Sequence, residues 1–486
     1  MRSITKEIFL NSMVCPALGW LMRSEQPIEQ LSWESLTLGE RFRIEQGLEI
    51  HRRARSIYPE GRLVPYINIQ AAAKETNKLI TDPIIKIIYE AAFTADDYVA
   101  KADMLVRNRK GWHIVEVKSD TNDKPELVDD IGYTAMVVKR TGLHVNKVSL
   151  MLISKDYRLG MPDERLFVMI DHTAEAMERV EDFNLFWGMV KEITGVPEKP
   201  EARTRRECKK CPLFRDCVGR GIASHILEIP FLSQKKFDGL VERGIERIED
   251  IPTDFELTPR QSTIRQCVIE GEPYVNPKLR SELDKVDWPA YYLDFETVMT
   301  AIPLYPDLAP YTQLPTQYSI HKCSDVGEVV DHREFLADST RDCRRELAEG
   351  LIRDLEENGS IIVYSNFERT TISRLANLYP DICSGLDCLV ERMVDLEAII
   401  KSCYYHPEFH GSFSIKSTLP VLVPEMNYGD LEIADGASAS ASFAYLAMGK
   451  HEKVEAEMVT RNLLEYCRRD TLAMVKLHER LSDYCR

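Results

Sequence analysis

The sequence predicts a mixed α/β protein with two folded domains, and two observations lead to this prediction. The 486 residues exceed what a single hydrophobic core usually organises. Strand-like apolar segments alternate with helical segments in two separate stretches, residues 84–155 and 288–486. The composition, 44% hydrophobic and 29% charged, is typical of a globular protein. No apolar run reaches the roughly 18–20 residues that a membrane helix needs. Polar residues also interrupt the apolar N-terminal stretch, so we expect a cytoplasmic protein without membrane contact.

The first domain is expected to span residues 1–222 and to lay a helix across a sheet. A loop or short strand and a helix containing Cys15 come first, and a helix over residues 34–58 carries apolar residues among many charges. Four apolar segments predict the sheet, with a helix at about 126–142 before the last of them: IIKIIYEAAF, VAKADMLVR, GWHIVEVKS and KVSLMLIS. A further helix near residues 174–194 completes the α/β arrangement.

A connector is expected between the domains, over residues 223–287. Its first part, residues 232–252, fits two short helices around Gly244 and resembles a helix-hairpin-helix module that binds a DNA backbone. A plain connector is the alternative for this part. Residues 253–288 contain several prolines and charged residues and are predicted to be a linker.

The second domain is expected to span residues 288–486 and to begin with the strand AYYLDFET. Strands near 315–336, a helix at 340–357, the strand SIIVYS and a helix at 368–378 follow. A long helix is predicted from about residue 455 to the end. This order of strands and helices predicts a second α/β sheet.

Charge is distributed unevenly along the chain. A net charge of −16 argues against a protein that coats nucleic acid by bulk attraction. Basic residues nevertheless gather between Arg203 and Arg220, and three cysteines lie in the same stretch, which distinguishes it from an ordinary solvated loop. We expect this patch to contact nucleic acid, through Arg203, Arg205, Arg206, Lys209 and Lys210.

The strand HIVEVKS carries the first candidate site. Alternation places Ile114, Glu116 and Lys118 on one face of the strand, and a buried carboxylate beside an amine is costly unless it has a function. Asp103 lies at the end of the apolar strand upstream. Phosphodiester hydrolysis needs a divalent cation, a polarised water and a positive group. We therefore predict that Asp103 and Glu116 hold the cation and that Lys118 orients or activates the water. An exposed edge strand with a surface Glu–Lys pair is the alternative.

Four of the twelve cysteines form a candidate ligand set. In a chain without an export signal, disulfides are not expected, and most cysteines are predicted to be small buried hydrophobes. Cys208-x2-Cys211-x5-Cys217 is compact, whereas Cys15 lies alone near the N-terminus. Four thiolates suit both zinc and an iron–sulfur cluster, so the ligand set alone leaves both open.

Residues 1–220 resemble the PD-(D/E)XK nucleases of the RecB type, especially the iron–sulfur branch that includes the CRISPR-adaptation exonucleases and AddB. The resemblance rests on the Asp and Glu-x-Lys pattern, on Gly47-x-x-x-His51, and on the cysteine spacing with the N-terminal segment ITKEIFLNSMVCPALGWL. It implies that His51 is an additional metal ligand favouring manganese. It also implies that a [4Fe–4S] cluster closes the fold, held by Cys15, Cys208, Cys211 and Cys217.

The helix after the Glu-x-Lys strand extends this resemblance. It carries Asp129, Asp130 and Tyr133, and Tyr133 is expected to help to bind nucleic acid. Thr134 stands where the family often has a glutamine, a departure that concerns DNA positioning and not metal binding.

The second candidate site lies in YYLDFET and in the C-terminal helix. Leu293 and Phe295 are expected to point into a core, while the acids Asp294 and Glu296 share the opposite face, about 7 Å apart along the strand. Like charges so placed repel unless cations lie between them. In LLEYCRRDTLAMVKLHERL, Tyr466 and Asp470 are one turn apart on one face. A strand end with solvated acids is the alternative.

Residues 288–486 resemble the DEDD exonucleases of the RNase H-like fold, in the subgroup with Tyr-x3-Asp. The resemblance implies two Mg²⁺ or Mn²⁺ ions held by Asp294, Glu296 and Asp470, with Tyr466 positioning the attacking water. In VYSNFERTTI, Glu368 stands where the family has its third acid, usually an aspartate.

Two further features belong to this half of the chain. Asp395 is a weaker candidate ligand and is expected to be structural. The chain as a whole resembles an uncharacterised bacterial family that fuses a RecB-like nuclease to such a domain, including the stretch GSFSIKSTLP over residues 411–420.

The leading hypothesis is a metal-dependent nuclease that degrades or trims DNA from its ends in repair, recombination or defence. A helicase or a recombination or defence protein is the candidate partner. An RNA exonuclease with a vestigial first domain is the second hypothesis, because a contact to a 2′-hydroxyl cannot be predicted from sequence. A non-catalytic nucleic-acid adaptor is the third. The intact acids at both sites argue against the adaptor, because unneutralised carboxylates repel phosphate.

Overall fold

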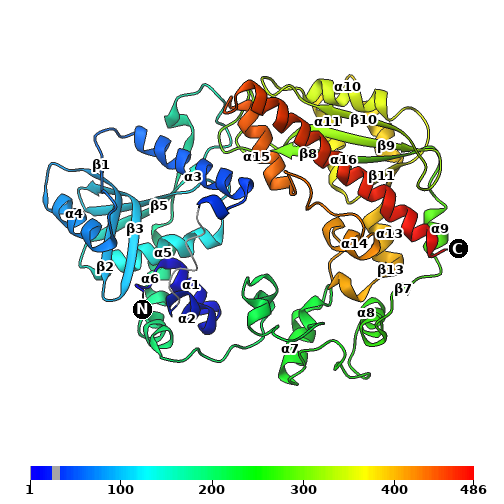
Figure 1. The fold of residues 1–486 in the computed structure, drawn as a ribbon. Coiled ribbons are helices and arrows are strands. Elements are labelled where there is room, and N and C mark those ends of the chain that lie inside the picture. The colour runs from blue at the N-terminus through cyan, green and yellow to red at the C-terminus, as the bar shows by residue number, and fades with distance from the viewer. Residues whose placement is uncertain (1, 25–32, 486) are drawn as a thin grey trace. The chain divides into compact units, whose positions relative to one another are not determined.

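The computed structural model describes residues 2–24 and 33–485. The chain folds into two compact units (Figure 1), each with a sheet and helices, which confirms the mixed α/β class. Unit 1 joins Met1–Arg203 with Met299–Thr312, and unit 2 joins Thr204–Val298 with Gln313–Arg486. The segment Met299–Thr312 belongs to unit 1, where the hydroxyl oxygens of Tyr311 and Ser119 lie 2.7 Å apart.

Unit 1 is built on a six-stranded sheet in the order β1-β2-β3-β4-β5-β6. The β2–β3 and β3–β4 pairs are antiparallel, as expected for consecutive hairpins, and β4 pairs in parallel with β5 after a helical crossover. The strands are β1 Arg62–Leu63, β2 Ile87–Ala95, β3 Tyr98–Asn108, β4 Gly111–Val117, β5 Val145–Ile153 and β6 Phe167–Asp171.

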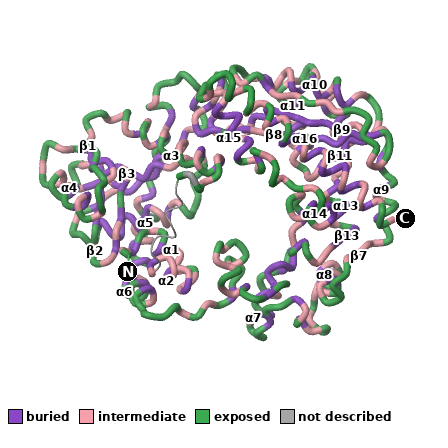
Figure 2. Tube along the Cα trace, in the orientation of Figure 1, coloured by how far each residue is buried: buried purple, intermediate pink, exposed green. Residues whose placement is uncertain are grey.

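Helices cover both faces of this sheet. One core contains residues of α1, α5 and α6 against the strands, and a second core places α3 against the other face. Figure 2 shows the buried residues running along the strands. The helices are α1 Lys6–Val14, α2 Pro16–Ser24, α3 Leu38–Ser56, α4 Ile69–Thr81, α5 Pro125–Arg140 and α6 Thr173–Gly195, with short 3₁₀ turns η1 Trp33–Ser35 and η2 Asp163–Arg165.

Two predicted placements in unit 1 were wrong. Cys15 is not inside a helix but lies between α1 and α2 with an extended backbone, because the residue before Pro16 is sterically excluded from the helical region. Asp103 lies in the middle of β3, not at the end of the strand. The helix predicted at 34–58 forms over Leu38–Ser56, where Thr37 and Glu40 make a reciprocal cap.

Unit 2 contains a five-stranded mixed sheet in the order β10-β9-β8-β11-β12. The β8–β9 and β9–β10 pairs are antiparallel, and β11 pairs in parallel with both β8 and β12. A separate two-stranded sheet joins β7 and β13. The strands are β7 Tyr274–Val275, β8 Ala290–Val298, β9 Leu314–Cys323, β10 Val329–Leu336, β11 Ile361–Val363, β12 Met393–Asp395 and β13 Tyr404–Tyr405.

The helices of unit 2 lie on both faces of the five-stranded sheet. α13, α14 and the long α16 pack on one face, and α10, α11 and α12 pack on the other. The helices are α7 Gln234–Glu242, α8 Pro259–Glu270, α9 Leu279–Leu283, α10 Arg344–Asp354, α11 Phe367–Leu378, α12 Cys383–Glu391, α13 Leu396–Cys403, α14 Ile415–Leu422, α15 Gly436–Ala447 and α16 Lys453–Asp483, with 3₁₀ turns η3 Arg206–Lys210, η4 Phe214–Asp216, η5 Ile226–Glu228 and η6 Pro407–Phe409.

The stretch before β8 is more ordered than predicted. Residues 232–252 contain the single helix α7, and the second short helix expected after Gly244 is not formed in this described stretch. Gly244 has a φ of +70°, and the chain beyond it packs Ile248 and Ile251 into a small core. The predicted linker, residues 253–288, contains α8, β7 and α9.

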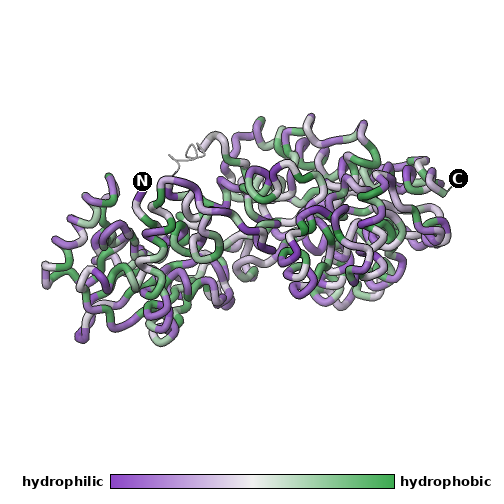
Figure 3. Tube along the Cα trace, turned by 90° about the horizontal axis from the view of Figure 1, so that it is seen from below, coloured by the Kyte–Doolittle hydropathy of each residue, from purple (hydrophilic) through white to green (hydrophobic). Residues whose placement is uncertain are grey.

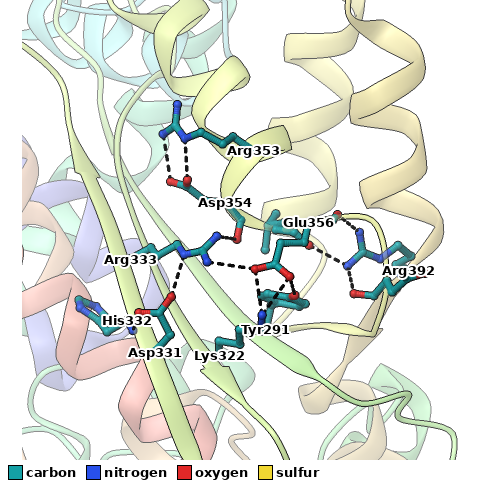
Figure 4. A network of polar contacts seen from close by, with 11 residues as sticks. Tyr291, Lys322, Asp331, His332, Arg333, Arg353, Asp354, Glu356 and Arg392 are labelled. Carbon is teal, nitrogen blue, oxygen red and sulfur yellow. Dashed lines mark hydrogen bonds and ion pairs between the residues drawn. The ribbon is translucent and has the colours of Figure 1, made fainter.

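A saturated polar network lies at one end of the sheet in unit 2 (Figure 4). Glu356 accepts hydrogen bonds from Lys322, Arg333 and the hydroxyl of Tyr291. Arg392 donates to four backbone carbonyls, those of Leu355, Glu356, Asn358 and Gly359. Each charged group here has a partner, so the network is structural.

Among the described residues, no helix combines the length and the apolar character needed to cross a membrane. Hydrophilic and hydrophobic residues instead alternate along the trace of both units (Figure 3).

Candidate metal centres

The first centre lies where β3 and β4 pair in the middle of the unit 1 sheet. Alternation along β4 is as predicted: Val115 and Val117 join the core with α3, whereas Glu116 faces α5. Asp103 on β3 accepts a hydrogen bond from the backbone N–H of Val117 at 2.8 Å. Glu116 is 3% exposed and accepts from the hydroxyl of Thr134 at 3.0 Å. Thr134, the residue at the expected glutamine position, therefore orients the carboxylate of Glu116.

Lys118 lies just beyond β4 on the same face as Glu116. Its ammonium is 2.7 Å from a carboxylate oxygen of Asp130 on α5, and Lys6 contacts the same oxygen at 3.1 Å. Burial acts against the charged form, but Glu116 and Asp130 prevail and raise the pKa of Lys118. Lys118 is therefore protonated at this centre, and its ammonium is fixed by the ion pair with Asp130.

The buried surroundings of the two acids at the first centre disfavour their ionised forms. Burial, reinforced by the charge of Asp103, raises the pKa of Glu116 to about 8. Burial also raises the pKa of Asp103. Burial lowers the pKa of His51, so its imidazole is neutral and can act as a ligand. Two acids and a neutral imidazole in one place match the donor set of a divalent cation.

Glu90 is a fourth group at this centre, and it was not among the residues predicted from the sequence. One ligand atom each from His51, Glu90 and Asp103 lies within 4.8 Å of the others. The pairs Tyr89↔Met104 and Ala91↔Ala102 place Glu90 directly opposite Asp103 across the β2–β3 ladder. Glu90 also pairs with Lys101 at 2.7 Å and with Arg55 at 3.6 Å.

Glu90 could have been found from the sequence by its pairing. Ala95 pairs with Tyr98, so only the two acidic residues between them form the hairpin loop. A two-residue loop determines the register of the flanking strands, and that register brings Glu90 to Asp103.

A cavity of about 730 Å³ opens onto this centre within unit 1. Its lining brings the acids Asp103 and Glu116 and the neutral His51 together with the cations Lys6, Lys101 and Lys118. The mixture suits a bound cation on one side and an anionic substrate on the other.

Tyr133 on α5 is buried, and its hydroxyl donates to the backbone carbonyl of Ile4 at 2.8 Å and contacts that of Val99 at 3.0 Å. It ties the N-terminal segment to the sheet, so in this structure its hydroxyl is engaged within the protein. Asp129 on the same helix pairs with Arg179 at 2.6 Å.

The second centre lies where α16 crosses β8 in unit 2. Leu293 and Phe295 point into the core with α10, α11 and α12, so Asp294 and Glu296 face α16, as predicted. One carboxylate oxygen each from Asp294, Glu296 and Asp470 lies within 4.8 Å of the others. The structure thus brings together three of the predicted ligands from β8 and α16, which lie far apart in the sequence.

The charges of these acids act on one another. Burial and the neighbouring carboxylates, first that of Asp470, raise the pKa of Asp294 and of Glu296 well above their ordinary values. Burial raises the pKa of Asp470 to about 6. Burial and the charge of Asp470 raise the pKa of Tyr466, so its hydroxyl stays protonated.

Glu368 lies at the start of α11 and is 3% exposed. Its oxygen Oε2 is buried and has no hydrogen-bond partner among the described residues. Burial raises its pKa to about 7, and its charge acts on Asp294. This buried, unpartnered oxygen is available to a bound cation. Asp395 instead caps α13, accepting from the N–H of Ala398 at 3.0 Å, which supports the expected structural role.

Two residues from the segment between α13 and α15 complete the second centre, and neither was among the residues predicted from the sequence. The hydroxyl of Tyr428 donates to Asp470 at 2.5 Å. Lys416 lies 6.0 Å from the ring of Tyr428, and its charge opposes the raised pKa of Glu296 and Asp470 that burial causes. Lys416 lies in GSFSIKSTLP, a motif that could have led to it.

The four candidate cluster cysteines are divided between the units. Cys208, Cys211 and Cys217 lie at the turns η3 and η4 in unit 2, and Cys15 lies in unit 1. No disulfide joins these cysteines among the described residues. The cluster therefore remains a prediction. The basic side chains of the patch are exposed: Arg203, Arg205, Arg206, Lys209 and Lys210.

Part of this chain is similar to known proteins. Residues 291–414 match a family described as a domain of unknown function, DUF2779. An uncharacterized protein, UU173 of Ureaplasma parvum, is 24% identical over 212 residues, which cover 38% of this chain and 30% of the relative. Another, MG366 of Mycoplasma genitalium, is 21% identical over 224 residues, covering 42% and 33%.

These alignments span about a third of the length of the curated relatives. The matched domain contains Asp294, Glu296 and Glu368 and ends before Tyr466 and Asp470. The relatives are described as uncharacterized proteins, so the chemistry of this chain has to be inferred from its own residues.

Proposed function

We propose that this chain is a divalent-metal-dependent nuclease that hydrolyses phosphodiester bonds of DNA, with one centre in each unit. The observation that carries the proposal is the second centre, where an oxygen of each of three carboxylates lies within 4.8 Å of the others. Buried acids so close together repel strongly unless cations neutralise them. The RecB-like and RNase H-like DEDD assignments, and a role in repair, recombination or defence, are part of this proposal.

The donor sets fit Mg²⁺ or Mn²⁺. At the second centre, Asp294, Glu296, Asp470 and Glu368 would hold the ions. At the first, His51, Glu90, Asp103 and Glu116 would do so. Bound ions would neutralise charge on the scissile phosphate and lower the pKa of a coordinated water.

The remaining residues position the reactants. The protonated hydroxyl of Tyr466 hydrogen-bonds the attacking water, and Tyr428 holds Asp470 in place. At the first centre the charged Lys118, fixed by Asp130, stabilises negative charge that develops on the phosphate oxygens. Tyr466 and Lys118 both act as hydrogen-bond donors, because their surroundings keep them protonated.

An assay with end-labelled substrates tests the proposal. Protein purified without oxygen is incubated with single-stranded DNA, duplex DNA and RNA, in Mn²⁺ or in EDTA. We expect metal-dependent cleavage of DNA, reduced roughly 100-fold or more at the affected centre by Lys118→Ala or by Asp294→Ala. Cleavage that persists in EDTA, or that neither variant reduces even when combined, contradicts the proposal. Cleavage of RNA alone assigns the activity to RNA.

We also propose a [4Fe–4S] cluster held by Cys15, Cys208, Cys211 and Cys217, with a structural role. The thiols carry no disulfide, which leaves them available as ligands. Protein purified without oxygen should be brown and contain about four irons per chain, and Cys211→Ser should lose both. The matched control is Cys388→Ser, an exposed cysteine outside the set. A colourless wild-type protein that contains zinc would contradict the cluster.

A further inference from the structure

A second kind of pocket lies in unit 2, away from the carboxylates. α8 lies beside the two-stranded β7–β13 sheet (Figure 1), and residues of both line a cavity of about 260 Å³. Its walls include Arg260, Thr263, Tyr274, Lys401, Tyr405 and Phe413. None of the acids of the second centre lines it, so it is a separate site.

The lining is cationic and aromatic in an acidic protein. Two cations and no carboxylate line this cavity, although the chain has a net charge of −16. Lys401 is already paired with Glu397 at 2.6 Å. The positive end of the twelve-residue helix α8 adds to the field in the cavity. These features favour an anion.

Arg260 is a cation of this cavity whose guanidinium lacks a hydrogen-bond partner among the residues that the structure describes. Within the described part of the chain it makes no hydrogen bond or ion pair, and its Nη2 atom is buried. The guanidinium lies 4.8 Å from the ring centre of Phe413 and 5.8 Å from that of Phe231. Aromatic faces attract a cation but do not replace the hydrogen bonds that the N–H donors of the buried Nη2 atom lose.

Arg392 shows what a satisfied arginine of similar burial looks like in the same unit (Figure 4). Burial lowers the pKa of both Arg260 and Arg392 from the ordinary value. Arg392 compensates with four hydrogen bonds to backbone carbonyls, whereas Arg260 has none. An unpaired, partly desolvated charge is costly, so Arg260 indicates a ligand that supplies the missing acceptors.

Phe231 supplies a surface beside this charge. Its side chain is 79% exposed, and its backbone is left-handed, with a φ of +56°. An exposed aromatic side chain on a strained backbone is costly in the free protein, and such strain is found at ligand-binding positions. A flat ring next to a cation is the arrangement that receives a base stacked beside its own phosphate.

We propose that this pocket binds the phosphate of a nucleotide, with Arg260 as its counter-cation and Phe231 as the stacking surface for the attached base. The preference for an anion follows from the pocket alone, and the choice of a nucleotide rests on the proposed nuclease function. The volume is below the roughly 300–1,000 Å³ of a site that encloses a whole ligand. The phosphate therefore enters the cavity and the base remains outside, against Phe231.

Binding to the full chain in EDTA tests the proposal without cleavage. Calorimetry compares inorganic phosphate, deoxyadenosine, deoxyadenosine monophosphate, and an oligonucleotide with and without a terminal phosphate. We expect the monophosphate to bind at least tenfold more tightly than the nucleoside, and Arg260→Gln to remove this difference. Arg280→Gln, which removes an exposed arginine with an ion pair at 4.0 Å, should leave it unchanged.

Two further variants keep the test independent of folding defects. Phe231→Gly relieves the left-handed backbone and removes the ring, so it should weaken binding of the monophosphate but not of inorganic phosphate. Thr263→Glu places a carboxylate one turn from Arg260, so it should abolish binding of both ligands while raising the melting temperature. Unchanged binding in Thr263→Glu would overturn the proposal.

The outcomes separate this inference from the proposed function. Equal affinity for nucleoside and monophosphate overturns the pocket, whatever the nuclease assay shows. Arg260-dependent phosphate binding in a protein without nuclease activity supports the pocket and contradicts the function. Tighter binding of the phosphorylated oligonucleotide than of the monophosphate supports the pocket with a strand end as ligand, and the reverse order supports it with a released nucleotide.

Discussion

Individual acids at both centres have pKa values above the ordinary range of a carboxyl group. Glu116, Glu368 and Asp470 are each at most 8% exposed, and burial raises their pKa values to about 8, 7 and 6. A cation would reverse this by favouring the ionised form. The groups that titrate near neutral pH are thus the same groups that would hold metal.

These pKa values predict that the metal-free protein loses stability as pH rises. Because the folded state holds these protons more tightly than the unfolded chain, the free energy of unfolding should fall between about pH 6.5 and pH 8.5 in EDTA. Buried histidines such as His478, with a pKa lowered to about 4, act in the opposite sense only below the ordinary histidine pKa of 6.5. Melting temperature against pH measures the effect.

Saturating Mn²⁺ should remove most of this pH dependence, because it binds the ionised carboxylates. The combined variant Glu116→Gln and Glu368→Gln should weaken the dependence in EDTA. A melting temperature in EDTA that rises through this pH window would refute the assignment of these acids.

Short elements of the backbone determine which side chains reach each centre. The two-residue loop between β2 and β3 sets the register that brings Glu90 opposite Asp103. In GSFSIKSTLP, Gly411 has a φ of +75°, and a Cβ there would lie 1.7 Å from the carbonyl oxygen of Glu228. This glycine lets the loop that carries Phe413 pack directly against the chain near η5.

Gly411→Ala should therefore destabilise unit 2 by more than backbone strain alone explains. We expect a loss on the order of 2–4 kcal/mol, because both the left-handed backbone and the carbonyl clash must be relieved. Gly449→Ala is the matched control: its φ is +65°, but a Cβ would meet nothing within 4 Å, so about 1 kcal/mol is expected. Equal losses in denaturant unfolding would show that the close contact is relaxed at little cost.

The whole molecule consists of two units with their own cores. Leu150 is fully buried in the unit 1 core, and Leu347 is fully buried in a unit 2 core. Each centre uses only residues of its own unit, so the stability of one core supports one centre.

Core substitutions should act on one unit at a time. Leu150→Ala and Leu347→Ala should each cost roughly 2–5 kcal/mol and shift one of two calorimetric transitions. Each should also reduce metal affinity only at the centre of the affected unit. A single transition that both substitutions shift equally would show that the units unfold together.

Much of the architecture followed from local patterns. Alternation in HIVEVKS and YYLDFET placed Glu116, Asp294 and Glu296 on the correct faces, because a strand side chain has only two directions to take. The spacing Tyr-x3-Asp placed Tyr466 and Asp470 on one face of α16 for the corresponding helical reason. The predicted second helix after Gly244 failed, because the following isoleucines pack into a core without forming a helix.

The chain's local periodicity is sufficient to define its strands, its long helices and the acids that they present, because these depend on neighbours a few residues away. Tyr428, Lys416 and the unpaired Arg260 could not be identified in this way. Their roles depend on which distant side chains they meet: Tyr428 meets Asp470, 42 residues away, and Arg260 meets Phe413. Electrostatic and aromatic contacts are set by distance in space, and only the packed fold establishes that distance.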